Sequence, residues 1–279
     1  MKKLQFTGHE TFYCRSYWLK KGLDHLWKDG KFNDKAVVPL GVGKNMVSAI
    51  RFWLRAFGLV DTEDRANEFA ELLFGENGLD PYCEDIGTLW LLHYSLVNRD
   101  YSSIYRLVFQ DFRKQRVEFT REHLLTYLER HCTDKDFTYH TSSLKRDISV
   151  FINNYITPSK GGIEDNFMGL LHELKLVNKL DKSGDWYKVE IGVKTDLPPE
   201  IFLFALLHTY QDSETLSIPN IQEVASIFAL DSEGLKQKID FIVKQYASSV
   251  VFTEDAGVSV LQFKTVIDRW EVLKTYYAA

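Results

Sequence analysis

The sequence predicts a mainly α-helical α+β fold with small β-hairpins, built from up to three winged-helix or helix-turn-helix modules. Three segments carry apolar residues at positions i, i+4, i+7/8 and i+11, beginning at Met46, Leu144 and Leu235, which indicates amphipathic helices with one buried face. Each follows a shorter helical segment and precedes a strand-rich stretch. Helix, turn, helix and hairpin is the element order of a winged helix, and the N-terminal module is the clearest of the three.

In chain order, each module has a short helix, then the amphipathic helix, then strands. The short helices are expected at 36–40, 121–132 and 221–230. The amphipathic helices are expected at 46–57, 144–155 and 235–246. The strand-rich stretches are expected from 59–61 continuing toward 74, at 186–193, and at 250–252 with 258–263, and helices over 88–112 separate the first module from the second.

Clusters of glycine and proline mark the best breaks in the chain, at 75–78, 157–162 and 194–199. We therefore expect three domains. Residues 1–78 form an N-terminal winged-helix DNA-binding domain, and 79–160 form a helical middle domain with a second helix-turn-helix-like unit. Residues 161–279 form a C-terminal α+β domain that could hold a third winged-helix-like unit.

The composition is that of a soluble globular protein, with 45% hydrophobic and 26% charged residues in 279. The longest apolar runs are far shorter than the ~20 residues of a membrane helix, so no membrane partner is expected. The first residues show no apolar signal region, and the three cysteines, Cys14, Cys83 and Cys132, are widely separated. These features predict a cytoplasmic protein, and the absence of a CxxC pair excludes a zinc knuckle.

The charge is uneven along the chain. Residues 1–60 hold 11 Lys and Arg against 4 Asp and Glu, a net charge of +7, whereas 61–100 hold 2 against 10, a net charge of -8. The net charge of -5 for the whole chain conceals this basic N-terminal segment, and nucleic-acid affinity depends on the local field. Alternatively, the basic segment and the acidic segment form two surfaces that pack against each other.

Two glycines, Gly41 and Gly43, lie just before the first amphipathic helix. A phosphate-binding P-loop is excluded, because Val38 stands where that motif needs glycine and Asn45 where it needs Ser or Thr. The glycines instead predict the tight turn of a helix-turn-helix, since they adopt backbone angles closed to other residues.

The helix after this turn has a polar stripe opposite its apolar face. Lysine, asparagine and arginine suit phosphates and base edges, and the positive end of the helix dipole favours an anion. The stripe therefore predicts a DNA contact, and a solvated basic face is the alternative. The candidate DNA-binding residues are Lys44, Asn45, Ser48, Arg51 and Arg55.

His9 and Glu10 precede an aromatic helical segment. They could act as a general base or a metal ligand, or they could form a capping arrangement with Thr11. Adjacent residues in a helix do not face each other, so both reach one site only from a turn.

Three carboxylates, Asp80, Glu84 and Asp85, lie within six residues around a proline. They suit a divalent cation, since Mg²⁺ is usually held by one or two carboxylates and keeps its waters. They equally suit a helix N-terminus, where acidic side chains are favoured by the helix dipole. His93, on an apolar helix farther along, is expected to be a core histidine with a hydrogen-bond partner.

Four sequence blocks resemble the signatures of a bacterial family of domains of unknown function that is linked to DNA phosphorothioation. Members are encoded beside a cysteine desulfurase and a sulfur-inserting enzyme related to phosphoadenosine phosphosulfate reductase. The resemblance is strong over residues 4–95, looser through 154–155, and without a dense motif in the C-terminal third. The blocks are FTGHETF (6–12), LGVGKNM (40–46), DPYCED (80–85) and TLWLLHY (88–94).

The resemblance implies a DNA-binding protein of a phage-defence system that nicks one strand, with Mg²⁺ as cofactor, so that sulfur can replace a phosphate oxygen. The implied partners are DNA, the desulfurase, the reductase-like enzyme and an ATPase. In the matching blocks, His9 and Glu10 are the catalytic candidates and Asp80, Glu84 and Asp85 the metal candidates. The alternative is a non-catalytic winged-helix adaptor or regulator that recruits the sulfur-modifying enzymes, and a third option is a structural scaffold.

Overall fold

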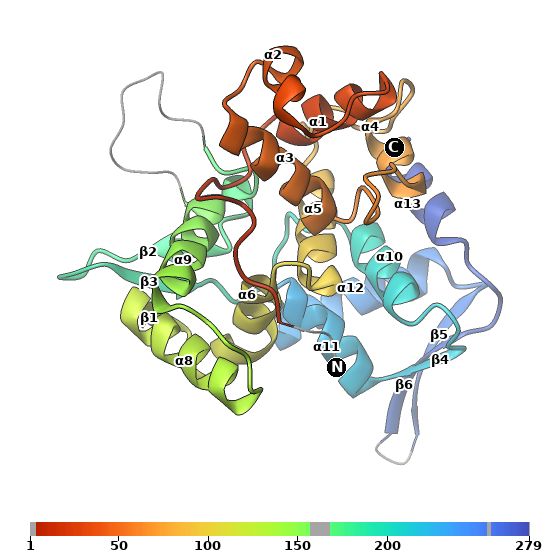
Figure 1. The fold of residues 1–279 in the computed structure, drawn as a ribbon. Coiled ribbons are helices and arrows are strands. Elements are labelled where there is room, and N and C mark those ends of the chain that lie inside the picture. Colours follow the sequence, from red (N-terminus) through yellow and green to blue (C-terminus); the bar gives the residue numbers. More distant parts are fainter. Residues whose placement is uncertain (1–3, 157–167, 256–257, 279) are drawn as a thin grey trace. The chain divides into compact units, whose positions relative to one another are not determined.

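The computed structural model describes residues 4–156, 168–255 and 258–278 (Figure 1). The chain forms two compact units, Met1–Glu190 (unit 1) and Ile191–Ala279 (unit 2). The predicted α+β class is confirmed, because the units are mainly helical and each has one three-stranded antiparallel sheet. The break predicted at 157–162 lies outside the described residues, and the three domains with boundaries at 78 and 160 stay a prediction.

The N-terminal part of unit 1 is helical. Its long helix α3 buries Ile50, Trp53 and Leu54, the predicted apolar stripe, and packs on α1. Gly41, at φ 58°, ends α2 in the left-handed conformation and lets the chain turn sharply into α3. The elements are α1 (Trp18–Trp27), the 3-10 turn η1 (Asp34–Ala36), α2 (Val37–Leu40), α3 (Lys44–Ala56) and α4 (Glu68–Phe74).

The prediction of a strand-rich stretch over 59–74 is wrong for most of that length. It contains one isolated bridge, between Val60 and Ala66, and its last part is the helix α4. The reason is a cap: the Asn67 side chain accepts a hydrogen bond from the Ala70 N–H at 3.1 Å, which fixes the start of a helix.

The helices predicted over 88–112 are present. His93 on α5 is fully buried and its Nδ1 lies 2.8 Å from the hydroxyl of Tyr155, which confirms a core histidine with a partner. The elements are α5 (Ile86–Arg99), α6 (Ser103–Arg106), the π-helical segment η2 (Leu107–Phe112) and α7 (Arg113–Gln115).

The rest of unit 1 combines two helices with a sheet in the strand order β1-β3-β2. Phe119 pairs with Tyr187 and Val177 with Val189 in this antiparallel sheet. Helix α9 buries the predicted apolar stripe, which includes Phe151. The elements are β1 (Glu118–Thr120), α8 (Arg121–Asp134), α9 (Thr141–Tyr155), the 3-10 turn η3 (His172–Leu174), β2 (Val177–Lys179) and β3 (Trp186–Val189).

Unit 2 also combines helices with a three-stranded antiparallel sheet, and the strand order of this sheet is β4-β6-β5. Lys238 is only 5% exposed, because it lies one turn from Ile242 on the buried face of α12. Burial lowers the pKa of its ammonium, and the charges of Asp196 and Glu200 oppose this shift. The elements are α10 (Pro199–Thr209), β4 (Thr215–Ser217), α11 (Ile218–Ile227), α12 (Ser232–Gln245), β5 (Val250–Asp255), β6 (Val258–Phe263) and α13 (Arg269–Tyr277).

An N-terminal segment, residues 4–16, is bonded to parts of unit 1 that follow it by about a hundred residues or more. The Gln5 N–H donates to the Ser103 hydroxyl, and the Ser103 N–H donates back to the Gln5 carbonyl, both at 3.0 Å. The Cys14 N–H donates to the Asn154 side chain at 3.0 Å, and the Leu170 N–H donates to the Cys14 carbonyl at 2.9 Å. This segment is therefore fixed to later elements of unit 1, and its Leu4, His9 and Cys14 are buried.

Candidate nucleic-acid interface

The first turn of α3 presents polar side chains to solvent. Lys44, Asn45 and Ser48 are exposed, and α3 begins directly after Gly43, whose lack of a side chain leaves the first N–H groups without a side-chain cap. Lys44 pairs with Asp34 at 3.0 Å, but both side chains are more than two-thirds exposed. Because such surface pairs contribute about 0–1 kcal/mol, Lys44 can exchange Asp34 for a phosphate at small cost.

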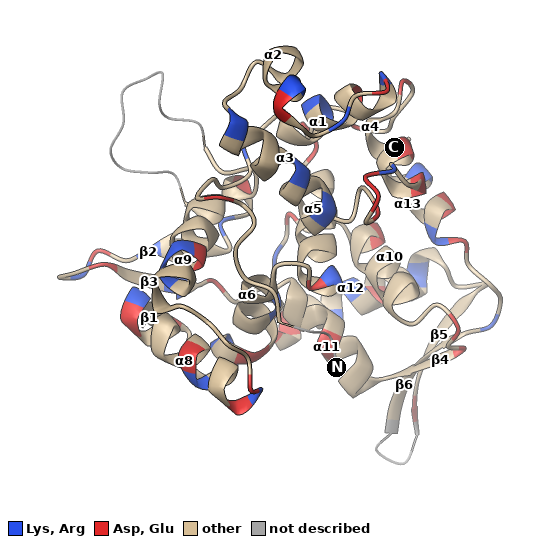
Figure 2. Cartoon of the chain, viewed as in Figure 1, with Lys and Arg blue, Asp and Glu red and all other residues tan. Residues whose placement is uncertain are grey.

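The other half of the predicted stripe is bound internally. Asp64 lies 2.8 Å from Arg51 Nε and 2.7 Å from Arg55 Nη2, so one carboxylate holds both arginines. Burial lowers the pKa of Arg55, but its hydrogen bond to Tyr101 and the charge of Asp64 outweigh burial, so that the pKa is raised and the side chain stays charged. Figure 2 shows basic positions along α3. The N-terminal half is exposed, with Lys44 in a surface ion pair, whereas Asp64 holds both arginines of the C-terminal half.

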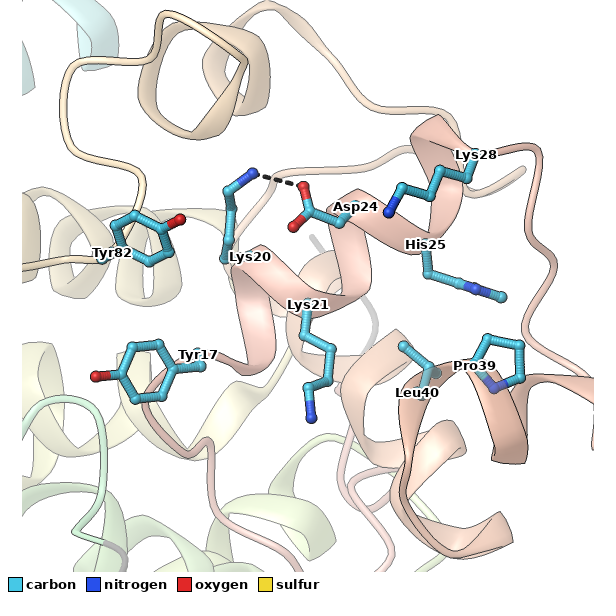
Figure 3. Close-up of a pocket in the computed structure, with 9 residues that line it drawn as sticks. All are labelled: Tyr17, Lys20, Lys21, Asp24, His25, Lys28, Pro39, Leu40 and Tyr82. Carbon is cyan, nitrogen blue, oxygen red and sulfur yellow. Dashed lines mark hydrogen bonds and ion pairs between the residues drawn. The ribbon is translucent and has the colours of Figure 1, made fainter.

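A pocket of about 320 Å³ lies between α1, the end of α2 and the loop before α5. Figure 3 shows Tyr17 and Tyr82 at the end where α1 begins, with His25 and Pro39 toward the other end. Its wall continues to Leu40 at the end of α2, four residues before Lys44 in the sequence. The remaining lining residues are Lys20, Lys21, Asp24 and Lys28.

His9 is buried rather than placed in an open site. It is 3% exposed, and its Nε2 lies 3.0 Å from Oδ1 of Asp147 on α9, which also accepts the Thr7 N–H at 2.9 Å. The ring stacks on Trp53. Within the described residues, His9 Nδ1 and Asp147 Oδ2 have no hydrogen-bond partner.

Glu10, in contrast, is exposed, and the loop that carries it has unusual backbone angles. Thr7, Gly8 and Glu10 have φ of 67°, 101° and 56°, a region that favours glycine, and strain of this kind is often found at functional sites. The Thr11 and Phe12 N–H groups both donate to the His9 carbonyl at 2.9 Å. The loop therefore separates the two predicted catalytic residues, with His9 facing the core and Glu10 facing solvent, and their catalytic roles stay predictions.

The three predicted metal ligands all lie at the start of α5. The Asp80 carboxylate accepts the Glu84 N–H and the Asp85 N–H, each at 3.0 Å, and Asp85 caps the helix through the Gly87 N–H at 2.7 Å. In the part of the chain that the structure describes, no group of three or more His, Cys, Asp or Glu side chains is arranged to hold a metal ion. Asp80 thus has a demonstrated backbone-holding role, and the metal role stays a prediction.

The Cys83 thiol, inside the same block, is not an activated nucleophile. Burial, followed by the negative charge of Asp80, raises the pKa of this thiol well above its ordinary value. The thiol is therefore protonated at neutral pH.

Replacing Asp80 is expected to destabilise unit 1. Asp80→Ala leaves the Glu84 and Asp85 N–H groups without their acceptor and should lower the free energy of unfolding by about 1–3 kcal/mol. Asp80→Asn keeps one acceptor oxygen and should lose less. Chemical denaturation of the two variants measures this difference, and Asp80→Ala unfolding at the same denaturant concentration as the unchanged protein would contradict the role.

Two features of the structure could not be predicted from the sequence. Asp147 lies 138 residues from its partner His9 in the chain, and no motif around Asp147 indicates this contact. Tyr17 and Tyr82 line one pocket although they are 65 positions apart in the chain, and only the structure shows that both rings are exposed.

Within residues 4–156, 168–255 and 258–278, no helix combines the length and apolar character that a membrane crossing requires.

The chain matches a protein-family model and is similar to solved structures. A family model described as "Protein of unknown function (DUF4007)" matches residues 6–277. The structure named "SspB crystal structure" is similar with a TM-score of 0.83 and 25% identity, over 98% of this chain and 88% of that chain. "Magnesium ion-bound SspB crystal structure" is similar with a TM-score of 0.84 and 24% identity, over the same shares. No curated protein matches the sequence.

Proposed function

The chain belongs to the DUF4007 family of proteins of unknown function, and from this premise we propose that it binds DNA and nicks one strand in a phosphorothioation defence system. The link to phosphorothioation rests on the sequence blocks at 6–12, 40–46, 80–85 and 88–94 and on the similarity to SspB over nearly the whole chain. Its partners are then DNA and the sulfur-modifying enzymes of that system.

The observation that carries DNA binding is the exposed first turn of α3. It directs Lys44 and Asn45 outward, followed one turn later by Ser48, from a helix that follows a tight glycine turn. The two sheets support the same conclusion, since each unit places a helix pair before an antiparallel hairpin, the order of a winged helix. We therefore propose winged-helix modules around α9 and α12 in addition to the helix-turn-helix at α3.

Strand nicking needs charge stabilisation at the phosphate, which Mg²⁺ supplies when it is bound. The support for Mg²⁺ comes from the name of one similar structure and from three carboxylates in a matching block. The geometry of that block fits a metal poorly, because Asp80 and Asp85 already accept backbone N–H groups. Glu84 is the exposed member of the three.

The hydrogen bonds that Asp80 and Asp85 accept from the backbone also favour a second function. If Asp80 and Asp85 only hold the start of α5, the protein is a non-catalytic adaptor that binds DNA and recruits the sulfur-modifying enzymes. Both functions require DNA binding through α3, so binding alone does not distinguish them.

Plasmid relaxation separates the two functions. With supercoiled plasmid and Mg²⁺, the nickase is expected to yield open-circular product that a chelator abolishes, and Glu84→Ala should abolish the product without loss of stability. Glu76→Ala, which removes another exposed carboxylate from the same acidic segment, is the matched control and should nick normally.

Three other outcomes each have a definite meaning. Nicking that survives both Glu84→Ala and Asp80→Asn keeps the enzyme and moves the site to His9 and Glu10. Absence of nicking together with DNA binding that depends on Lys44 establishes the adaptor. Absence of both nicking and DNA binding overturns the proposed function.

A further inference from the structure

Two tyrosine rings are unusually exposed on one side of unit 1. Tyr17 is 65% exposed and Tyr82 is 55% exposed, and both line the pocket along α1. They come from separate motifs, one before α1 and one inside the acidic block. Exposed aromatic rings that meet at one concave surface indicate a binding site, because scattered single rings are normal but grouped ones are costly in water.

The backbone fixes the position of both rings. Tyr17 precedes α1 at φ 67°, with no capping hydrogen bond from its own side chain. Tyr82 is followed by Cys83 at φ 56°, and Asp80 holds this loop through the Glu84 and Asp85 N–H groups. Strain of this kind costs about 1–3 kcal/mol for each residue and is often found where a fold holds functional groups in place.

The charge along the pocket favours an anion. Asp24, the one carboxylate among the lining residues, is already paired with Lys20 at 2.5 Å. Lys21 on α1 and Lys28 directly after α1 are exposed, and neither forms an ion pair with the described residues. Figure 3 shows Lys21 nearer the end of the pocket with the two tyrosines, and Lys28 toward the other end, so the two unpaired ammonium groups are spread along the pocket.

From this arrangement we propose that the pocket binds an unpaired segment of a DNA strand. A base stacks on Tyr17 or Tyr82, and the adjoining phosphates contact Lys21 and Lys28. The pocket volume of about 320 Å³ lies in the range of small-ligand sites and suits a nucleotide. Duplex DNA is excluded as the ligand of this pocket, because its base faces are covered by neighbouring base pairs.

The inference rests on the proposed function, and it adds a ligand class and a second contact surface. α3 would hold the duplex through Lys44, and the pocket beside it would take the strand once it is unpaired. An enzyme that cuts one strand of a duplex must distinguish that strand from its complement, and a separate site for unpaired DNA provides this distinction.

The test compares single-stranded and duplex DNA in fluorescence anisotropy. The probes are a labelled oligothymidylate of about 12 nucleotides, within the site size of single-strand binding folds, and a mixed-sequence duplex. Tyr17→Ala combined with Tyr82→Ala is expected to weaken single-strand binding at least about tenfold, because stacking contributes about 1–3 kcal/mol per base. Duplex binding should change by less than about twofold, within ordinary surface-mutation effects.

Three controls make the result specific. Tyr17→Phe with Tyr82→Phe keeps both rings and should preserve single-strand binding. Phe241→Ala, which removes an exposed ring from unit 2, should have no effect. Lys21→Gln with Lys28→Gln should reduce the slope of log K against log salt by roughly 1.4 for the single strand, about 0.7 for each lost phosphate contact.

The outcomes separate this inference from the proposed function. Single-strand affinity that is absent, or unchanged in the double alanine variant, overturns the pocket, whatever the duplex does. Duplex binding that does not depend on Lys44, together with single-strand binding that depends on the tyrosines, overturns the α3 interface and leaves the pocket standing.

Discussion

His9→Ala is expected to lower the free energy of unfolding of unit 1 by about 3–5 kcal/mol, because it removes a ring packed in the core and leaves a buried carboxylate oxygen without that hydrogen-bond partner. The Asp147 carboxylate is fully buried and would keep only the Thr7 N–H as a donor. The variant also loses the stacking of His9 on Trp53. Urea denaturation, followed by tryptophan fluorescence, measures the change.

A double-mutant cycle assigns this loss to the pair. His9→Leu with Asp147→Leu should cost clearly less than the sum of the two single substitutions, because the second change removes the carboxylate that the first leaves unpaired. Glu10→Ala, next to His9 but exposed, is the control and should change stability by no more than about 0.5 kcal/mol. If His9→Ala abolishes nicking and leaves stability unchanged, His9 is catalytic and the structural role is refuted.

The second large effect concerns the α3 surface. Lys44→Glu with Ser48→Glu places two negative charges where a phosphate is expected to lie and should weaken duplex binding at least about tenfold, the factor equal to 1.4 kcal/mol. Lys236→Glu, which changes the charge by two units where the double variant changes it by three, is the control on an exposed lysine of unit 2. Equal losses in both variants would show that only net charge matters.

Two smaller comparisons refine this result. Arg55→Gln should weaken duplex binding less than Lys44→Gln, because Arg55 is 19% exposed and already held by Asp64. Asp34→Asn should strengthen binding slightly, since it releases Lys44 from its ion pair. The reverse order of Arg55 and Lys44 would place the contact at the other end of α3.

Local patterns in the sequence predicted the helices well. Ile50, Phe151 and Ile242 lie on buried faces as their spacing requires, because a helix repeats every 3.6 residues whatever it packs against. The stretch over 59–74 was predicted wrongly, since its apolar residues fit a strand and a short helix equally and the Asn67 cap decides for the helix.

The candidate site depended more on contacts between distant residues. The exposed turn at Lys44 follows from local glycines and is visible in the sequence. The ion pairs of Arg51 and Arg55 with Asp64 and the contact of His9 with Asp147 are set by tertiary packing, and no short motif encodes them. The same holds for the tyrosine pocket, which joins two segments that are 65 positions apart in the chain.

The bonds between residues 4–16 and later parts of unit 1 have a consequence for synthesis on the ribosome. Helices α1 to α3 emerge early, yet the acceptors for Thr7 and Cys14 are on α9, and Leu170 follows later still. Contacts of such high sequence separation form slowly and only after the intervening chain is available. A nascent chain that stops before α9 should therefore remain protease-sensitive at its N-terminus, and protection should appear in one step when α9 has left the exit tunnel.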